Sequence, residues 1–182
     1  YQNLAIFNVP SGFRGRSAFM VQLWWIVQAS LFAWSPQILY KWRVFLLRLF
    51  GAKIGKGVLI RASAKITYPW KLSVGDYVWI GDDSIIYNLA DIQIGSHVAL
   101  AHRVYLCTGM HDISKIGFDI FALPITLEDE VWLPNDVFVA PGVTVGRGTV
   151  IGARSSVFAD MPSGMICRGT PCVPVKPREM KV

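Results

Sequence analysis

Cysteine is scarce in this chain, which has only Cys107, Cys167 and Cys172 among its 182 residues. Three is an odd number for a disulfide framework, and the spacing of these cysteines matches no metal site. Reduced thiols in a cytoplasmic protein are therefore the simplest interpretation.

Signals for several other protein classes are missing as well. The central part of the chain has no run of Lys and Arg interleaved with aromatic residues, so nucleic acid is the weakest candidate partner. The first residues lack a basic stretch and a small-residue cleavage site, so we expect no cleavable signal peptide. The net charge of +6 and the pI of about 9.4 favour an anionic partner, either a phosphorylated cofactor or an anionic membrane surface.

The chain also lacks an apolar run of transmembrane length. Its most apolar stretch, from Ser17 to Trp34, is barely 18 residues long and includes two glutamines, whereas a spanning helix needs about 20 mostly apolar residues. We expect a helix here with Ser17 as its N-cap, and a second helix over 37–50 with Gly51 as its C-cap. These aromatic and basic helices either pack on the protein or a neighbouring subunit, or attach it peripherally to a membrane.

The sequence instead contains a six-residue repeat. An aliphatic residue recurs every six positions, and a small or β-branched residue stands four places after most of those in the second half. A period of six suits neither a helix nor a single strand. It suits a solenoid of short flat sides, in which the aliphatic residues point inward and glycines supply backbone freedom at the corners. The repeated aliphatic positions are Val74, Ile80, Ile86, Ile94, Leu100, Leu106, Leu127, Leu133, Val139, Val145, Ile151 and Val157.

This pattern resembles the hexapeptide repeat of the left-handed parallel β-helix acyltransferases, over about residues 54–161. The resemblance implies an all-β solenoid whose coils have three sides. We expect an N-terminal lead-in and apolar helices over 1–53, a left-handed parallel β-helix over 54–162, and a basic C-terminal tail over 163–182.

Three motifs narrow the resemblance: LRLFGAKIG at 47–55, YPW at 68–70 and CTGMHD at 107–112. They are similar to motifs of the proposed colanic acid biosynthesis acetyltransferase group. With them, the resemblance spans about Trp34 to Lys176.

The repeat changes phase once. Leu106 and Leu127 are 21 positions apart, which is three sides plus three residues, so the chain must leave the wall as a loop over 107–124. Insertions of this kind commonly carry function in solenoids. An imidazole can take the proton of a hydroxyl and later protonate a leaving thiolate. The resemblance places the catalytic histidine at the start of such a loop, which implies His111.

The resemblance also implies acceptor-binding residues. Asn88 matches the asparagine that orients the sugar, because an amide can both donate to and accept from a hydroxyl. The alternative is an asparagine at a coil corner, where it tolerates an unusual φ. Asp112 either orients the imidazole or contacts the sugar, and a solvent-exposed loop aspartate is its alternative.

For the coenzyme, the resemblance points to the later coils. Trp132, in a VWL triplet, matches the tryptophan of a VWIG motif that packs near the acetyl group and the pantetheine arm, although Pro134 replaces the glycine. Ala140, Ala153 and Ser155 are small enough to allow close approach of the pantetheine arm. Small residues are equally suited to coil corners.

The motif RGTPC at 168–172 resembles the GNPA turn of the family, which is usually followed by a basic residue. Val173 stands at that place here, which puts that phosphate contact in doubt. Arg168, Lys176 or Arg178 could supply the charge instead, since basic side chains bind phosphate strongly. A solvated basic tail is the alternative.

His97 and His102 point to a different chemistry. Their spacing of five resembles the histidine pair of the gamma-class carbonic anhydrases, which share this fold and bind zinc with three histidines. No histidine precedes His97, so we expect no metal and interpret both as polar corner residues.

The sequence therefore predicts an O-acetyltransferase that uses acetyl-CoA and a sugar acceptor from an exopolysaccharide or its precursor, with His111 as general base. The resemblance implies a homotrimer with each site between two subunits. The few cysteines and the lack of a signal peptide favour the cytoplasm, either free or at the inner face of the membrane. Two alternatives stay open: an N-acetyltransferase acting on an amino sugar, and a non-catalytic hexapeptide scaffold. No motif in the sequence specifies the sugar, the hydroxyl that is acetylated, or whether the sugar is attached to a nucleotide or a lipid.

Overall fold

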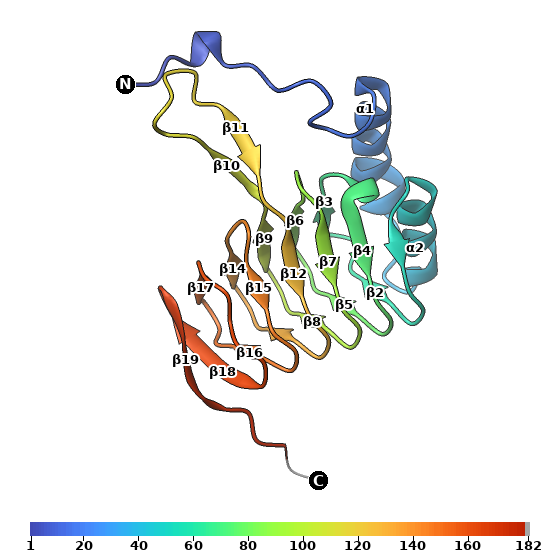
Figure 1. Ribbon diagram of the computed structural model, residues 1–182. Helices are drawn as coiled ribbons and strands as arrows, with labels where there is room; N and C mark the ends of the chain where they lie inside the picture. The colour runs from blue at the N-terminus through green and yellow to red at the C-terminus, as the bar shows by residue number, and fades with distance from the viewer. Residues whose placement is uncertain (181–182) are drawn as a thin grey trace.

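The computed structural model describes residues 1–180 and confirms the left-handed parallel β-helix. Figure 1 shows short strands stacked into flat walls, with helices α1 and α2 at one end and strands β18 and β19 at the other. We call the three sheets wall 1, wall 2 and wall 3 in the order in which the chain visits them. Successive strands within each wall run parallel, apart from β19.

Each wall gains one short strand from each coil. Wall 1 contains β1 (Lys53–Ile54), β4 (Leu72–Val74), β7 (Ile92–Ile94), β12 (Ile125–Leu127) and β15 (Thr144–Val145). Wall 2 contains β2 (Leu59–Ile60), β5 (Trp79–Ile80), β8 (Ala99–Leu100), β13 (Trp132–Leu133), β16 (Val150–Ile151), β18 (Met165–Gly169) and β19 (Cys172–Pro177). Wall 3 contains β3 (Lys65–Ile66), β6 (Ile85–Tyr87), β9 (Tyr105–Cys107), β14 (Phe138–Val139) and β17 (Ser156–Val157).

The repeated aliphatic residues form the interior of the solenoid, as predicted. Leu133, Val139 and Ile151 have no exposed surface, and they belong to one continuous core cluster that runs the length of the coils. Burial of aliphatic area is the main stabilising term in such a fold. The six-residue period therefore reports which side chain of each flat side points inward.

The glycines of the repeat have a different role from the one we expected. Many corners are turned by residues other than glycine with positive φ, including His97 at 59° and Arg103 at 56°. Gly81 and Gly146, which follow inward aliphatic residues, lie where a Cβ would overlap the backbone of the next coil, at Ala101 and Ser163 respectively. These glycines are required by the close stacking of coils, and not by the corner conformation.

The N-terminal helices begin and end close to the predicted positions. Ser17 caps α1 (Ala18–Val27) by accepting from the Met20 amide, and one π-helical turn, η2 (Gln28–Phe32), continues it. Helix α2 spans Tyr40–Leu49, and Gly51 follows with a φ of +97°. Two short 3₁₀ helices are η1 (Leu4–Ile6) and η3 (Pro69–Lys71). Across residues 1–180, the helices are all too short or too polar to cross a membrane.

Two strands, β18 and β19, lie within the range 163–182 that we assigned to a basic tail. Strand β18 pairs in parallel with β16 and extends wall 2, and β19 turns back antiparallel to β18. Backbone hydrogen bonding therefore continues the solenoid beyond residue 162, the end that the repeat predicted. Residues 181–182 of the predicted tail lie outside the described part of the chain.

A buried arginine joins α2 to the first coil. The guanidinium of Arg43 is fully buried and donates to the Ile60 carbonyl at 2.6 Å and to the Ser35 hydroxyl at 2.8 Å. It also donates to the carbonyls of Pro36 and Gln37, at 3.0 and 2.7 Å. Every group that it contacts is an acceptor, so the cation is satisfied without a carboxylate partner.

We expect Arg43→Met to lower the free energy of unfolding by about 2–4 kcal/mol, because several buried acceptors lose a charged donor. Urea denaturation followed by circular dichroism measures this change. Lys41→Met is the matched control, since Lys41 lies on the exposed side of the same helix, and it should change stability by less than about 0.5 kcal/mol. Equal midpoints for the two variants would contradict the role given to Arg43.

Candidate active site

The predicted loop over 107–124 is largely a β-hairpin. Strand β10 (Gly109–His111) pairs antiparallel with β11 (Ile120–Ala122), and His111 lies opposite Ile120. Figure 1 shows this hairpin projecting away from the solenoid, between the end of β9 in wall 3 and the start of β12 in wall 1. The inserted residues thus leave the solenoid at the corner between walls 3 and 1. The strands of both walls stay in register before and after the insertion.

Thr108 fastens the hairpin to the preceding coil. Its side chain is fully buried, donates to the Tyr87 carbonyl at 2.9 Å and accepts from the Ala90 amide at 3.0 Å. The Leu123 amide donates to the Thr108 carbonyl at 2.9 Å and closes the base of the hairpin. The position of the hairpin is therefore set by one buried threonine at the corner.

His111 has one ring nitrogen engaged by the hairpin itself. Its Nδ1 lies 2.7 Å from the carbonyl oxygen of Phe118. A carbonyl oxygen can only accept, so Nδ1 carries the hydrogen and Nε2 of the neutral ring keeps its lone pair. The imidazole is half-buried and no hydrogen bond occupies Nε2 among the residues described.

Two aromatic rings flank the imidazole. The Phe118 ring stacks on it with centroids 4.1 Å apart and planes 8° apart, and the Phe7 ring lies 5.7 Å away at 52°. Phe118 has a φ of 51°, which is rare for a bulky residue and occurs in the turn that directs its carbonyl to His111. The stack on Phe118, together with the contact of Nδ1 with the Phe118 carbonyl, thus determines the orientation of the histidine.

The contact with Phe7 comes from a part of the chain that no motif connects to the site. The N-terminal segment crosses from α1 to the hairpin, as Figure 1 shows, and the Asn3 amide donates to the Ile116 carbonyl at 2.8 Å. Phe7 closes the short apolar run Leu4-Ala5-Ile6-Phe7, and nothing in that run sets it apart from its neighbours. Sequence analysis therefore missed this residue.

Asp112 is engaged in the turn of the hairpin. Its carboxylate accepts from the hydroxyl and the amide of Ser114, at 2.5 and 3.0 Å. These two bonds lower the pKa of Asp112, because they stabilise the charged form. The residue also lines a hollow of about 510 Å³ with Asn8 and Lys115, between the N-terminal segment and the hairpin.

The prediction that Asn88 contacts the acceptor is not supported by its position. Asn88 is fully buried, its amide oxygen accepts from the Tyr68 amide at 2.9 Å, and its amide nitrogen donates to the Tyr68 carbonyl at 2.6 Å. Both groups that were expected to meet a sugar are used to join neighbouring coils. Asn88 does follow β6 at a corner, but its φ is not positive, so the unusual backbone conformation of the alternative interpretation is not what it supplies there.

The residues expected to bind the coenzyme fall into two groups. Trp132 is 47% exposed on the outer face of wall 2, and Lys176 is exposed on the same wall. The paired positions Trp132, Val150, Ile166 and Lys176 follow one another across this wall. Arg168, on β18, and Ala153, at a corner, are also exposed.

Ala140 and Ser155, in contrast, are buried. The Ser155 hydroxyl accepts from the Gly169 amide at 3.0 Å and so connects a corner to the end of β18. Neither side chain is exposed on the surface of the chain, so the expectation that their small size allows close approach of the pantetheine arm gains no support from their positions. Small size at these two positions serves the packing of the coils.

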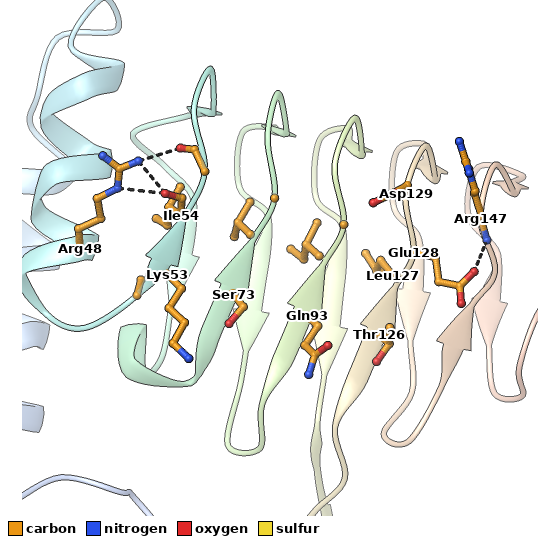
Figure 2. Close-up of a pocket in the computed structure, with 16 residues that line it drawn as sticks. Arg48, Lys53, Ile54, Ser73, Gln93, Thr126, Leu127, Glu128, Asp129 and Arg147 are labelled. Carbon is orange, nitrogen blue, oxygen red and sulfur yellow. Dashed lines mark hydrogen bonds between the residues drawn. The ribbon is translucent and has the colours of Figure 1, made fainter.

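A groove of about 830 Å³ lies over wall 1, away from His111. Figure 2 shows Lys53, Ser73, Gln93 and Thr126 in one row along its floor. Arg147 stands at one end, where its amide donates to Glu128 at 2.7 Å. None of the residues that line this groove is a predicted site residue, so its size alone does not identify the site.

His97 and His102 lie at corners of the solenoid. His97 stacks on Tyr77 with centroids 5.3 Å apart, and Nδ1 of His102 accepts from the Asp82 amide at 3.2 Å. Within residues 1–180, no three His, Cys, Asp or Glu side chains come together as a metal site.

Comparison with known proteins places the chain among acetyltransferases. It is 60% identical over 177 residues to the proposed colanic acid biosynthesis acetyltransferase WcaF of Escherichia coli K12, and the match covers 97% of both chains. A maltose O-acetyltransferase from Clostridium difficile 630 has a similar structure, with a TM-score of 0.77, 26% identity and coverage of 90% of both chains. No protein-family profile matches the chain.

The hexapeptide-repeat acetyltransferase VCA0836 of Vibrio cholerae, solved in complex with acetyl coenzyme A, shares the fold. Its TM-score is 0.82 at 22% identity, with coverage of 91% of this chain and 92% of that chain.

We expect Thr108→Val to lower the free energy of unfolding by about 1–3 kcal/mol, because the Tyr87 carbonyl and the Ala90 amide each lose a buried partner. Urea denaturation gives the value. Thr126→Val is the matched control, since Thr126 is half-buried on the outer face of wall 1 and should change stability by less than about 0.5 kcal/mol. If both variants lose the same amount, Thr108 does not fasten the hairpin.

Proposed function

Because this chain belongs to the family of the proposed colanic acid biosynthesis acetyltransferases, we propose that it transfers acetyl from acetyl-CoA to a hydroxyl of an exopolysaccharide sugar or its precursor. The observation that carries the proposal is the His111 imidazole, whose Nδ1 lies 2.7 Å from a carbonyl acceptor and whose Nε2 keeps a free lone pair. A nitrogen base of this kind is what acyl transfer to a hydroxyl requires.

In the proposed reaction, Nε2 of His111 takes the proton of the acceptor hydroxyl while the oxygen attacks the thioester carbonyl carbon. The carbonyl becomes a tetrahedral oxyanion, which a backbone N–H stabilises. When the oxyanion collapses, the bond to sulfur breaks and the imidazolium returns its proton to the thiolate of CoA. The acetyl ester and free CoA are the products.

The Phe118 carbonyl assists both proton transfers. It accepts the hydrogen of Nδ1 throughout, so the ring keeps its orientation and the imidazolium formed in the first transfer is stabilised by a hydrogen bond. Stacking on Phe118 prevents the ring from rotating out of this bond. The hairpin thus supplies both the base and the group that selects its tautomer.

The arrangement of one chain supports a site shared between subunits. The hairpin leaves the corner between walls 3 and 1, whereas Trp132 and Lys176 stand on wall 2, which is the side opposite that corner. A single solenoid cannot bring the two groups together. We therefore propose a homotrimer in which His111 of one subunit meets the coenzyme surface, formed by Trp132, Lys176, Arg168 and Ala153, of the next.

The proposed location is the cytoplasm. Cys107, Cys167 and Cys172 are all free thiols in the structure, in keeping with a reducing compartment. Burial raises the pKa of Cys172 to about 11, so this thiol stays protonated and unreactive at neutral pH.

Replacing His111 by Ala should lower kcat by at least about two orders of magnitude, because a general base of this kind typically contributes a hundredfold or more. Release of CoA from acetyl-CoA in the presence of a panel of sugars and amino sugars measures the rate. His97→Ala, which removes an exposed corner histidine, is the control and should keep full activity. Near-normal turnover by the His111 variant would refute the assignment. If CoA is released only with amino sugars, the proposed reaction would be N-acetylation and not O-acetylation.

A shared site makes a second prediction, which tests the assembly. Trimers made only of His111→Ala chains, or only of Trp132→Ala chains, should have little activity. In trimers assembled from equal amounts of both chains, about one site in four should take an intact His111 from one subunit and an intact Trp132 from the next, and these sites should be active. Co-expression with two affinity tags provides the mixed trimers. No recovery in mixed trimers, or a monomer by light scattering, would contradict a site between subunits.

A further inference from the structure

The charge of the chain is divided unequally. Residues 1–75 include ten Lys and Arg and no Asp or Glu, and the first acidic residue is Asp76. The remaining residues contain eight basic and twelve acidic side chains. The N-terminal helices and the first coil are therefore a cationic end on a solenoid whose later coils are net acidic.

Helix α2 at this end is apolar on two sides. Its inner side packs on the first coil through Val44 and Leu47. The outer side presents Trp42, Phe45 and Leu49, all exposed, at the spacing of one helical stripe. The Trp42 and Phe45 rings stack on each other at 5.7 Å. The inner stripe is explained by the solenoid core. In the outer stripe the Trp42 indole N–H donates to the Leu31 carbonyl at 3.0 Å, while the apolar surfaces of Phe45 and Leu49 stay exposed.

The apolar surface continues into the turn before α2. Trp34 and Ile38 are 86% and 81% exposed, and Leu31 is exposed beside them. Two hollows, of about 600 and 410 Å³, meet at Leu39 and Trp42. We call this surface the docking face; it consists of Leu31, Trp34, Ile38, Leu39, Trp42, Phe45 and Leu49.

Cations lie around the docking face. Lys41 and Lys56 line the larger hollow together with Ile38 and Trp42, and both lysines are exposed. Within residues 1–180 neither lysine forms a salt bridge, and the Lys56 ammonium lies 5.8 Å from the centroid of the Tyr77 ring. The hollow therefore offers apolar surface and exposed positive charge at the same place.

We propose that the docking face binds the surface of an anionic lipid bilayer, with the tryptophan and aliphatic side chains in the headgroup region and Lys41 and Lys56 near lipid phosphates. Tryptophan is enriched at membrane interfaces because its ring is apolar and its N–H is polar. Basic residues on such a face add electrostatic attraction to anionic lipids.

Charge favours a bilayer over a second copy of this chain as the occupant. Two copies meeting through their docking faces would bring the exposed Lys41 and Lys56 of each chain close to those of the other, and like charges repel. An anionic surface removes this repulsion. The proposal stands on the helices and Lys56 of the first coil and does not depend on the chemistry of His111.

The test is co-sedimentation of the full chain with vesicles of phosphatidylcholine alone and of phosphatidylcholine mixed with phosphatidylglycerol. We expect at least about tenfold more binding to the mixed vesicles, with a loss of binding as salt rises. Trp34→Ser and Ile38→Ser should each reduce this binding several-fold, and Lys41→Glu should reduce it while weakening its salt dependence.

Trp79→Ser is the matched control, because Trp79 is 60% exposed on wall 2, outside the docking face, and it should bind vesicles as the parent chain does. Thermal unfolding checks that every variant is folded. Absence of vesicle binding, or equal binding by the Trp34 and Trp79 variants, overturns the proposal. The proposal is also overturned if the protein without vesicles forms an assembly larger than a trimer and Trp34→Ser disperses that assembly. The docking face would then join copies of the chain.

Discussion

Stacking of one coil directly on the next is the constraint on which this structure depends. Each flat side donates its backbone amides to the side above, as the Ala101 amide does to the Leu133 carbonyl at 2.9 Å. An inward aliphatic residue fills the space at every level. Close stacking leaves no room for a Cβ at Gly81, and it forces any inserted residues out at a corner. The β10–β11 hairpin is the result: the walls stay in register, and His111 stands outside the core.

The candidate site is assembled by segments distant in the chain. The Phe118 carbonyl orients His111 from within the hairpin, Phe7 covers it from the N-terminal segment, and Thr108 fixes the base of the hairpin to the coil before it. These contacts determine where one free ring nitrogen lies. The residues proposed for the coenzyme occupy the opposite wall, so the same solenoid offers the base to one neighbour and the coenzyme surface to another.

The two ends of the solenoid are covered in different ways, because exposed coil ends would leave core and backbone groups open to water. At the first coil, α2 covers the core and buries Arg43 against carbonyls. At the last coil, β18 and β19 continue wall 2 and turn back on themselves. The outer face of the first cover presents Trp42, Phe45 and Leu49, and it lies in the part of the chain that lacks acidic residues.

The sequence by itself determined the solenoid, the approximate helix boundaries and the candidate base. It did so because each inward position recurs every six residues, Ser17 is a local cap, and a loop must form where the period breaks before Leu127. Only the tertiary structure decided that Asn88 and Ser155 are buried, and that Phe7 reaches His111. The period reports which way a side chain points within its own coil. Its partners belong to neighbouring coils or to distant segments, as Tyr68 does for Asn88, and no local pattern records them.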